Sequence, residues 1–243
     1  LQEFEHAREC YEQSLGIASQ HQYSFWIFYN MVALARAARL EKRYNVAENL
    51  LQDLFGRISL DVSAGEEALF RQEYGCLLLE TNKPRQAAEE LTLATRLYEQ
   101  DGRILELNIC RLWLAASLSQ SGQVGTVLLH IQDFVRAYRA MKETAPLQVA
   151  AGQVRTWFDQ ISFPPELSTA MQQLFTQSAL LNAKIPALRR KLRQVSKSAF
   201  ISQPRLKIHG FGPAQVFLNG KKVSLSDWQT RETRDLFFFF LQS

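Results

Sequence analysis

Residues 74–91 read YGCLLLETNKPRQAAEEL, which places two apolar segments on either side of a short polar turn. Gly75 stands before the turn and Ala87 after it, and both residues are small. Two helices approach closely where the side chains at their contact are small. Pro84 suits the first turn of the second helix, where the missing amide donor is not needed. The stretch therefore predicts a pair of antiparallel helices that meet at Gly75 and Ala87.

The pattern around this turn recurs along the chain at a step of 40 residues. The small residue of the second helix recurs at Ala7, Ala47, Ala87 and Val127. Four and seven residues later, on the same helix face, stand Tyr11, Leu51, Leu91 and Ile131, and Ser14, Leu54, Ala94 and Phe134. The small residue of the first helix recurs at Ala35, Gly75 and Ala115. Such repeats predict stacked helix pairs, each of which buries its apolar face on the next.

The small–large–small pattern resembles the tetratricopeptide repeat, whose usual length is about 34 residues. A step of 40 is similar to the longer version found in MalT-like signal-transduction regulators. The resemblance covers residues 1 to about 161, with Val127 in place of the expected alanine. It implies that Leu1 falls inside the second helix of a pair, so we expect a first helix before it. MalT-like regulators often carry a nucleotide-binding domain ahead of the repeats, and if one exists here, it lies before Leu1.

The expected helices cover residues 2–19, 23–41, 45–59, 64–81, 84–100, 103–121, 124–142 and 146–161. Pro164–Pro165 opens a further helix to about residue 183, and Pro186 is expected to break or kink it, because proline removes a backbone donor and clashes with the preceding turn. In the basic helix that follows, 187–195, we expect an apolar stripe to pack on the last repeat, formed by Leu188, Leu192 and Val195. Docking of this helix on a membrane is the weaker alternative, since it has no aromatic anchors. The repeat domain is thus expected to cover 1–195, with a linker at 196–204.

From Arg205 the apolar period changes from that of a helix to that of a strand. The expected strands cover residues 206–211, 215–218 and 222–225. Asn219-Gly220 is a strong hairpin signal, because both residues tolerate a positive φ. A last helix is expected to begin near Thr230, an acceptable N-cap, and to run into the apolar stretch Phe237–Phe240.

These C-terminal residues, LKIHGFGPAQVFLNGKKVSLSDWQTRETRDLFFFFLQ at 206–242, resemble the start of the OmpR-type winged helix of SARP-class bacterial transcriptional activators. The shared features are the strand order, the turn at Gly212-Pro213, the Asn219-Gly220 hairpin and the entry WQTR at 228–231. In that family, the second and third helices and the wing read DNA, which implies that base readout lies beyond Ser243. The fold class expected is therefore mainly α, a helix-pair superhelix followed by an incomplete α+β winged-helix domain at 205–243.

Charge divides the chain in a way that fits this reading. Residues 1–166 hold 16 Lys and Arg against 21 Asp and Glu, whereas residues 167–226 hold 10 Lys and Arg and no acid. Concentrated positive charge favours a polyanion partner. From the C-terminal segment we expect contacts to DNA phosphates, by Lys221, Lys222, Arg231 and Arg234. Ordinary solvated surface charge is the alternative for all four.

By the same resemblance, one face of each first helix lines a concave groove that binds a protein or small effector. The residues implied there are Tyr29, Val32, Arg36, Arg39, Gln72, Cys76 and Leu79. Arg36 and Arg39 suit an acidic ligand, or are simply solvated. The aromatic stripe Phe25, Trp26, Phe28 and Tyr29 is expected to lie in the core rather than in a ligand site.

Enzymatic chemistry finds no support in the sequence. The four histidines are scattered, no phosphate-binding loop occurs, and the three cysteines lack metal or redox spacing. No catalytic residue, metal or cofactor is expected. No apolar run reaches the roughly 20 residues that span a bilayer, and the cysteine usage suits the cytosol. We expect a cytoplasmic regulator that acts on DNA through its complete C-terminal domain, and a homo-oligomer remains open. A repeat scaffold without a DNA role is the alternative.

Overall fold

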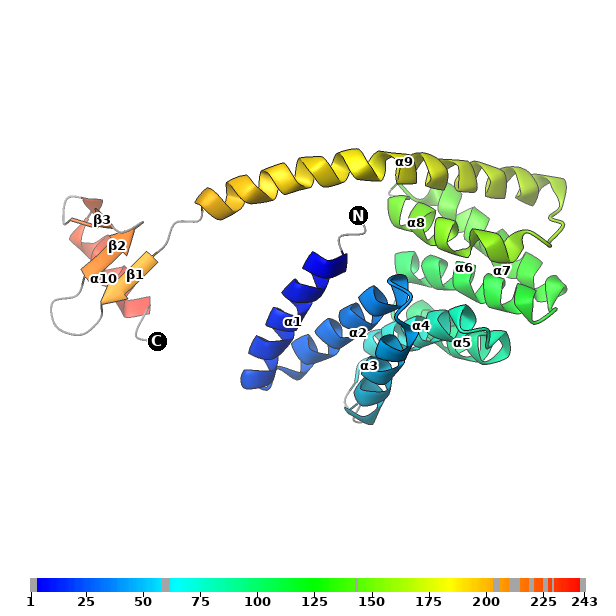
Figure 1. The fold of residues 1–243 in the computed structure, drawn as a ribbon, viewed down its shortest axis with the longest axis horizontal. Helices are drawn as coiled ribbons and strands as arrows, with labels where there is room; N and C mark the ends of the chain where they lie inside the picture. The colour runs from blue at the N-terminus through cyan, green and yellow to red at the C-terminus, as the bar shows by residue number, and fades with distance from the viewer. Residues whose placement is uncertain are drawn as a thin grey trace. The chain divides into compact units, whose positions relative to one another are not determined.

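The computed structural model describes residues 4–57, 62–142, 144–202, 206–209, 215–218, 221–224, 227–228 and 230–240. The chain divides into two compact units, Leu1–Pro186 and Ala187–Ser243. The first unit is a series of helices, and the second carries a small antiparallel sheet and one further short helix (Figure 1).

The first unit is built from helices that run back and forth (Figure 1). The first seven pack in sequence order, and the eighth packs against the sixth. The helices are α1 Phe4–Gln20, α2 Ser24–Leu40, α3 Tyr44–Arg57, α4 Ala64–Glu80, α5 Pro84–Gln100, α6 Ile104–Gln120, α7 Val124–Ala140, α8 Ala145–Val154 and α9 Pro165–Ser202, whose residues from Ala187 onward belong to the second unit. A short 3-10 helix, Arg155–Phe158, follows α8. The ends of α1 to α7 lie within two residues of the predicted ends, whereas the predicted helix 146–161 stops being α-helical at Val154.

Three-residue turns of one design join most of these helices. After α2, the Lys42 amide donates to the Arg39 carbonyl and the Arg43 amide to the Ala38 carbonyl, both at 2.8 Å. The same two bonds close α1, α4, α5 and α6. The middle residue of each turn has a positive φ: Gln22, Lys42, Asn82, Gly102 and Gly122. This is the Schellman C-cap, which favours glycine at the positive-φ residue. It reverses the direction of the chain within the turn.

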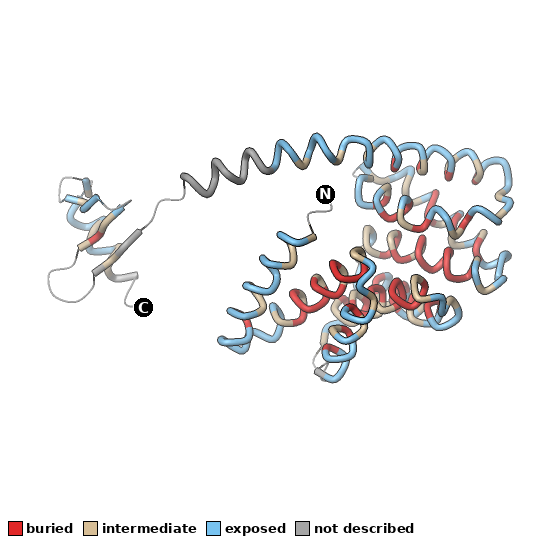
Figure 2. The backbone as a smooth tube through the Cα atoms, viewed as in Figure 1, coloured by how far each residue is buried: buried red, intermediate tan, exposed pale blue. Residues whose placement is uncertain are grey.

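The predicted close approach of α4 and α5 is confirmed. A Cβ built on Gly75 would lie 2.6 Å from Leu91 Cγ and 3.3 Å from the Ala87 carbonyl oxygen. The counterparts of this contact in the neighbouring pairs are wholly buried, namely Ala35, Ala47, Ala115 and Val127. Figure 2 shows the buried residues running along α2, α4 and α6 and along the sides of their partners that face them. The core therefore sits where small residues let paired helices nest.

The first helix departs from the pattern. Ala7 and Ser14 are only partly buried and Tyr11 is 38% exposed, although their counterparts in α3, α5 and α7 are buried. The physical reason is that α1 packs against the helix that follows it, α2, whereas α3, α5 and α7 each pack against the first helix of their own pair, α2, α4 and α6.

Of the two outcomes expected at Pro186, the break does not occur, because α9 runs from Pro165 to Ser202 with Pro186 inside it. Proline deprives the carbonyl four residues earlier of its hydrogen bond. That carbonyl belongs to Asn182, and both residues are exposed, so water can satisfy it. The residues expected to form a linker are helical as far as Ser202. Leu188 and Leu192, expected to pack, are instead 43% and 50% exposed.

The second unit holds three antiparallel strands in the order β1–β2–β3, formed by Leu206–His209, Gln215–Leu218 and Lys221–Lys222. Ile208 lies opposite Val216, and Phe217 opposite Lys222. Helix α10, Arg231–Phe240, begins where predicted, because the Thr230 hydroxyl accepts from the Thr233 amide at 3.1 Å. The predicted turns at Gly212-Pro213 and Asn219-Gly220 lie outside the described residues.

Candidate partner-binding surface

A buried ion-pair network joins α2 to α4. The Arg39 guanidinium lies 2.5 Å from a carboxylate oxygen of Glu73 and 2.5 Å from one of Glu80. Arg36 contacts the other Glu73 oxygen at 2.7 Å. The Arg39 guanidinium also stacks 5.1 Å from the centre of the Trp113 ring of α6, a cation–π contact. One arginine thus ties three successive first helices together.

Charge and burial act against each other in this network. Burial alone would raise the pKa of the Glu73 carboxyl, but Arg39 and Arg36 outweigh it and hold that pKa below its ordinary value. For Glu80, burial prevails over the attraction of Arg39, and the pKa is raised. Burial also raises the pKa of the Cys76 thiol well above its usual range, so Cys76 is inert.

Most of the residues predicted to line the ligand-binding groove are buried, some of them in this network. Of the seven residues assigned to the groove, five are buried, namely Val32, Arg39, Gln72, Cys76 and Leu79. Tyr29 and Arg36 are partly exposed. The interpretation of Arg39 as solvated or ligand-facing is wrong, because its charge is taken up by Glu73 and Glu80. Helices α4 and α6 bury residues around most of their circumference, which leaves little of them to line an open groove.

Sequence reasoning missed Glu73, Glu80 and Trp113. A usable signal was present, because Arg36 and Arg39 interrupt the otherwise apolar run NMVALARAARL at 30–40. A charge on a buried helix needs a partner of opposite sign. Glu73 stands in the next first helix, also inside an apolar pattern.

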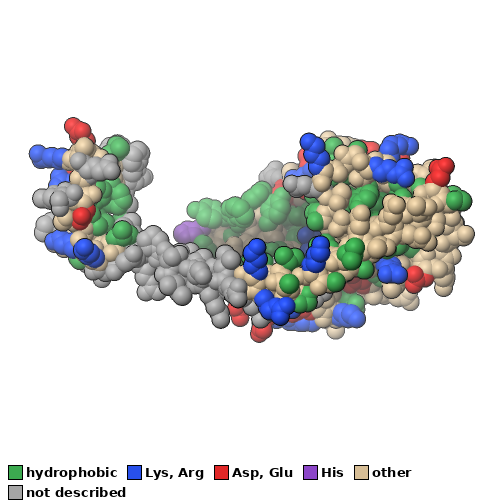
Figure 3. Space-filling model, turned by 90° about the horizontal axis from the view of Figure 1, so that it is seen from above, with side chains coloured by type: hydrophobic (Ala, Val, Ile, Leu, Met, Phe, Trp, Pro, Cys, Tyr) green, Lys and Arg blue, Asp and Glu red, His purple; other side chains and the backbone are tan. Residues whose placement is uncertain are grey.

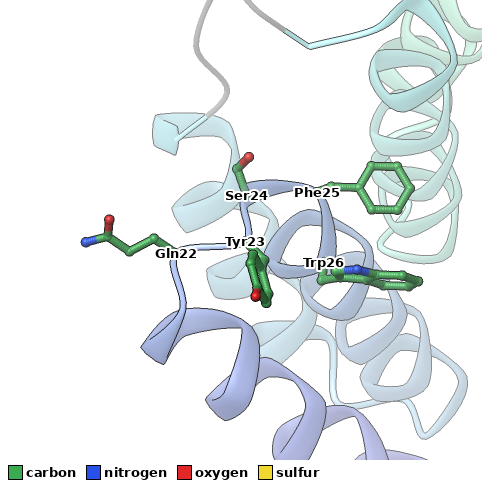
Figure 4. A pocket seen from close by; sticks show the side chains of 5 residues that line it. All are labelled: Gln22, Tyr23, Ser24, Phe25 and Trp26. Atoms are coloured by element: carbon green, nitrogen blue, oxygen red, sulfur yellow. The ribbon is translucent and has the colours of Figure 1, made fainter. Parts of the chain in front are cut away.

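The aromatic patch, defined here as Tyr23, Phe25, Trp26 and Tyr29, lies at the start of α2. Tyr23, Phe25 and Trp26 are 55%, 52% and 56% exposed. The Phe25 ring meets the Trp26 ring edge to face at 5.2 Å and the Tyr29 ring at 4.6 Å. Tyr23, Phe25 and Trp26, together with Gln22 and Ser24, line an open pocket of about 370 Å³ (Figure 4). Figure 3 shows hydrophobic side chains gathered over the end of the stack that holds α1 and α2.

The expectation that this stripe belongs to the core is correct for Phe28, which is 6% exposed, and wrong for Phe25 and Trp26. Trp26 occupies a position that carries a polar residue one and two steps of 40 later, at Glu66 and Glu106. An aromatic side chain at a solvent position buries little of its surface in the fold. Contiguous exposed apolar surface of this kind marks a site of interaction.

Gly65 lies where the start of α4 meets the residues just before α6. Arg103, directly before α6, pairs with Asp101 at 2.6 Å. A Cβ on Gly65 would collide with the Asp101 and Arg103 side chains. Gly65 therefore makes room for this ion pair at the edge of the stack.

The predicted phosphate contacts lie in the second unit. Lys221 and Lys222 are exposed on β3. The Arg231 side chain is 86% exposed and 4.0 Å from Asp235, whereas Arg234 pairs with Asp235 at 2.9 Å. Arg231 and Arg234 also line a pocket of about 350 Å³ with Trp228 and Thr230. The structure thus brings the two arginines together on α10 and leaves the two lysines on the sheet.

Among the described residues, no three His, Cys, Asp or Glu side chains are placed to hold a metal ion. No helix in this part of the chain is long and apolar enough to cross a membrane.

No family model matches the sequence, and no curated protein matches it. Among solved structures, the chain is similar to the crystal structure of BtubC (BKLC) from P. vanneervenii. The TM-score is 0.47 and the identity 11%, over 84% of this chain and 95% of that one.

Proposed function

We propose that the first unit is a tetratricopeptide-like repeat region that binds a protein or small effector and regulates a winged-helix DNA-binding domain, in a bacterial transcription regulator. The repeat assignment is supported by the starts of the first helices, Ser24, Ala64 and Ile104, which are 40 residues apart. The second helices, from Tyr44, Pro84 and Val124, start at the same step.

The observation that carries the proposal is the order of elements in the second unit. Three antiparallel strands, β1–β2–β3, are followed by α10 with Thr230 as its cap. This is the order expected at the start of an OmpR-type winged helix. The positive charge between residues 167 and 226 supports a polyanion as partner.

The sensor role is supported by the aromatic patch, which offers exposed rings on a rigid helix. Rigid aromatic side chains bind at a low cost in conformational entropy. The same patch favours a second candidate function, a repeat scaffold that binds a partner protein and has no DNA role.

Selection of genomic DNA fragments by the full-length gene product separates the two functions. A regulator enriches a recurrent sequence. Enrichment of no sequence would overturn the regulator and leave the scaffold.

A second measurement uses the present chain alone. Residues 1–243 are expected to bind duplex DNA weakly, without sequence preference and with a steep dependence on salt. The double variant Lys221→Glu/Lys222→Glu should reduce the slope of log affinity against log salt by about 2. The control Lys83→Glu/Arg85→Glu, on exposed residues of the first unit, should leave the slope unchanged.

A further inference from the structure

A single stripe, apolar except at Ser178, runs along α9 in alternate steps of four and three residues. Its described members are Leu167, Met171, Leu174, Ser178, Leu181, Ile185, Leu188 and Leu192. All of them lie on one helix, so the helix itself sets their spacing. An apolar repeat of 3.5 residues is the pattern of helices that pack side by side along their length.

The first half of the stripe is covered by the first unit. Leu167, Met171, Leu174 and Ser178 are no more than 8% exposed. Ser178 lies against Gly152 of α8, where a Cβ would collide with the Ser178 hydroxyl. In this half, the stripe residues are buried where the neighbouring helix α8 lies beside them.

The second half continues the pattern without such cover. Leu181 and Ile185 are partly exposed, and Leu188 and Leu192 are 43% and 50% exposed. Figure 3, which looks down on α9, shows Lys and Arg side chains beside hydrophobic side chains along its described part. The exposed half therefore presents apolar and basic side chains, the kind of surface with which one helix packs against another.

Charge decides what kind of partner fits. Lys184 and Lys191 each stand one residue before a stripe residue, and Arg189 stands directly after Leu188. These are the positions that flank a helix–helix seam and set the choice of partner. A second copy would bring basic residue against basic residue in either orientation. Residues 181–192 contain no Trp, Tyr or Phe, the side chains that anchor a helix at a membrane surface.

We propose that the α9 stripe, defined as Leu181, Ile185, Leu188 and Leu192, docks an acidic amphipathic helix of a partner protein. The partner helix presents apolar residues at the same 3.5-residue spacing and carries Asp or Glu on both flanks. Its carboxylates pair with Lys184 and Lys191 across the seam.

The test uses the whole chain and a labelled synthetic peptide of three heptads, with Leu at the seam and Glu on the flanks. A second peptide carries Lys in place of Glu. Fluorescence anisotropy should show binding of the acidic peptide, weakened by salt, and none of the basic peptide. Equal binding of both peptides, or of neither, would overturn the proposal.

Variants distinguish binding at the α9 stripe from non-specific hydrophobic binding. Leu188→Ser/Leu192→Ser should weaken binding by at least about tenfold, because two leucines lose their burial. Leu180→Ser is the matched control, since Leu180 is 58% exposed but lies off the stripe. Lys184→Glu/Lys191→Glu should transfer the preference to the basic peptide, a gain that an unfolded variant cannot give.

Two further outcomes would replace the proposal. Sedimentation that shows self-association lost in Leu188→Ser would assign the stripe to a second copy. Stronger binding to vesicles of phosphatidylglycerol and phosphatidylcholine than to the acidic peptide would assign it to a lipid surface.

Discussion

The Arg39 guanidinium lies 2.5 Å from the Glu73 carboxylate, and only 4% and 1% of these side chains are exposed. The two residues stand on neighbouring first helices, α2 and α4, and water can solvate almost none of either side chain. Removal of one partner leaves a buried charge without its match, which costs far more than the pair contributes.

Glu73→Gln is therefore expected to lower the free energy of unfolding by roughly 3 kcal/mol, the lower end for a broken buried pair, because Glu80 still pairs with Arg39. Urea denaturation followed by circular dichroism measures it. Asp133→Asn is the control, since the Asp133–Arg136 pair is exposed at 46% and 82%. The control should change stability by at most about 1 kcal/mol. Equal losses of unfolding free energy in both variants would mean that breaking the buried pair costs no more than breaking the exposed pair.

The same pair predicts a dependence of stability on pH. The pKa of Glu73 lies below its ordinary value of 4.5 in the folded chain. Its contribution is complete above pH 4.5 and is lost as the pH falls through the lowered pKa. Glu80, whose pKa is raised, acts in the opposite direction and favours the folded state once it is protonated. Unfolding free energies measured from neutral to acid pH should fall more steeply in the wild type than in Glu73→Gln. Parallel curves would refute this role of Glu73.

Gly75→Ala should destabilise the chain by about 1–3 kcal/mol, the cost of overpacking. The new Cβ would lie 2.6 Å from Leu91 Cγ, the branch point of a buried side chain. Gly125→Ala is the matched control, because Gly125 is helical and meets nothing within 4 Å. The control should be neutral or stabilising, since alanine favours helix. Thermal melts compare the two, and a stabilised Gly75→Ala would count against the close approach of α4 and α5.

Lys42→Gly should raise stability by about 1 kcal/mol, because a side chain at φ 61° pays the left-handed cost that glycine avoids. Gly122→Ala, at φ 81° with nothing within 4 Å, should lower stability by a similar amount for the same reason. Gly122→Ala meets no new atom, and Lys42→Gly removes the attraction between the Lys42 ammonium and Glu80, which acts against the expected gain. Opposite shifts in melting temperature therefore report the backbone effect. Shifts of the same sign would contradict it.

Trp26→Glu should leave stability within about 0.5 kcal/mol, as for other exposed positions. Phe28→Glu, two residues away and 6% exposed, should destabilise by roughly 3 kcal/mol or more. The dye 8-anilinonaphthalene-1-sulfonate reports exposed apolar surface, and its fluorescence should fall with Trp26→Glu in the folded chain. Unchanged dye binding would remove the aromatic patch from consideration as a binding surface.

Much of the helical framework followed from local signals. The turn around Asn82, the proline at the start of α5 and the small residues at Gly75 and Ala87 each favour the same helix pair, and they gave its ends closely. Pro186 shows the limit of such signals, because an exposed helix tolerates a proline that a buried one would not. The candidate site was predicted less well. Position on a helix face suggested that Arg39 meets a ligand, whereas its partners stand 34 and 41 residues away.

By itself, the sequence determined where helices begin, turn and end, because these depend on residues within a few positions of one another. It also determined the basic character of the chain beyond residue 166. Only the tertiary structure decided which side chains meet water. Arg39 is buried because Glu73 and Trp113 arrive from other helices, and Trp26 is exposed because nothing in the described fold covers it. Burial depends on neighbours distant in sequence, and the pattern on one helix cannot fix which those are.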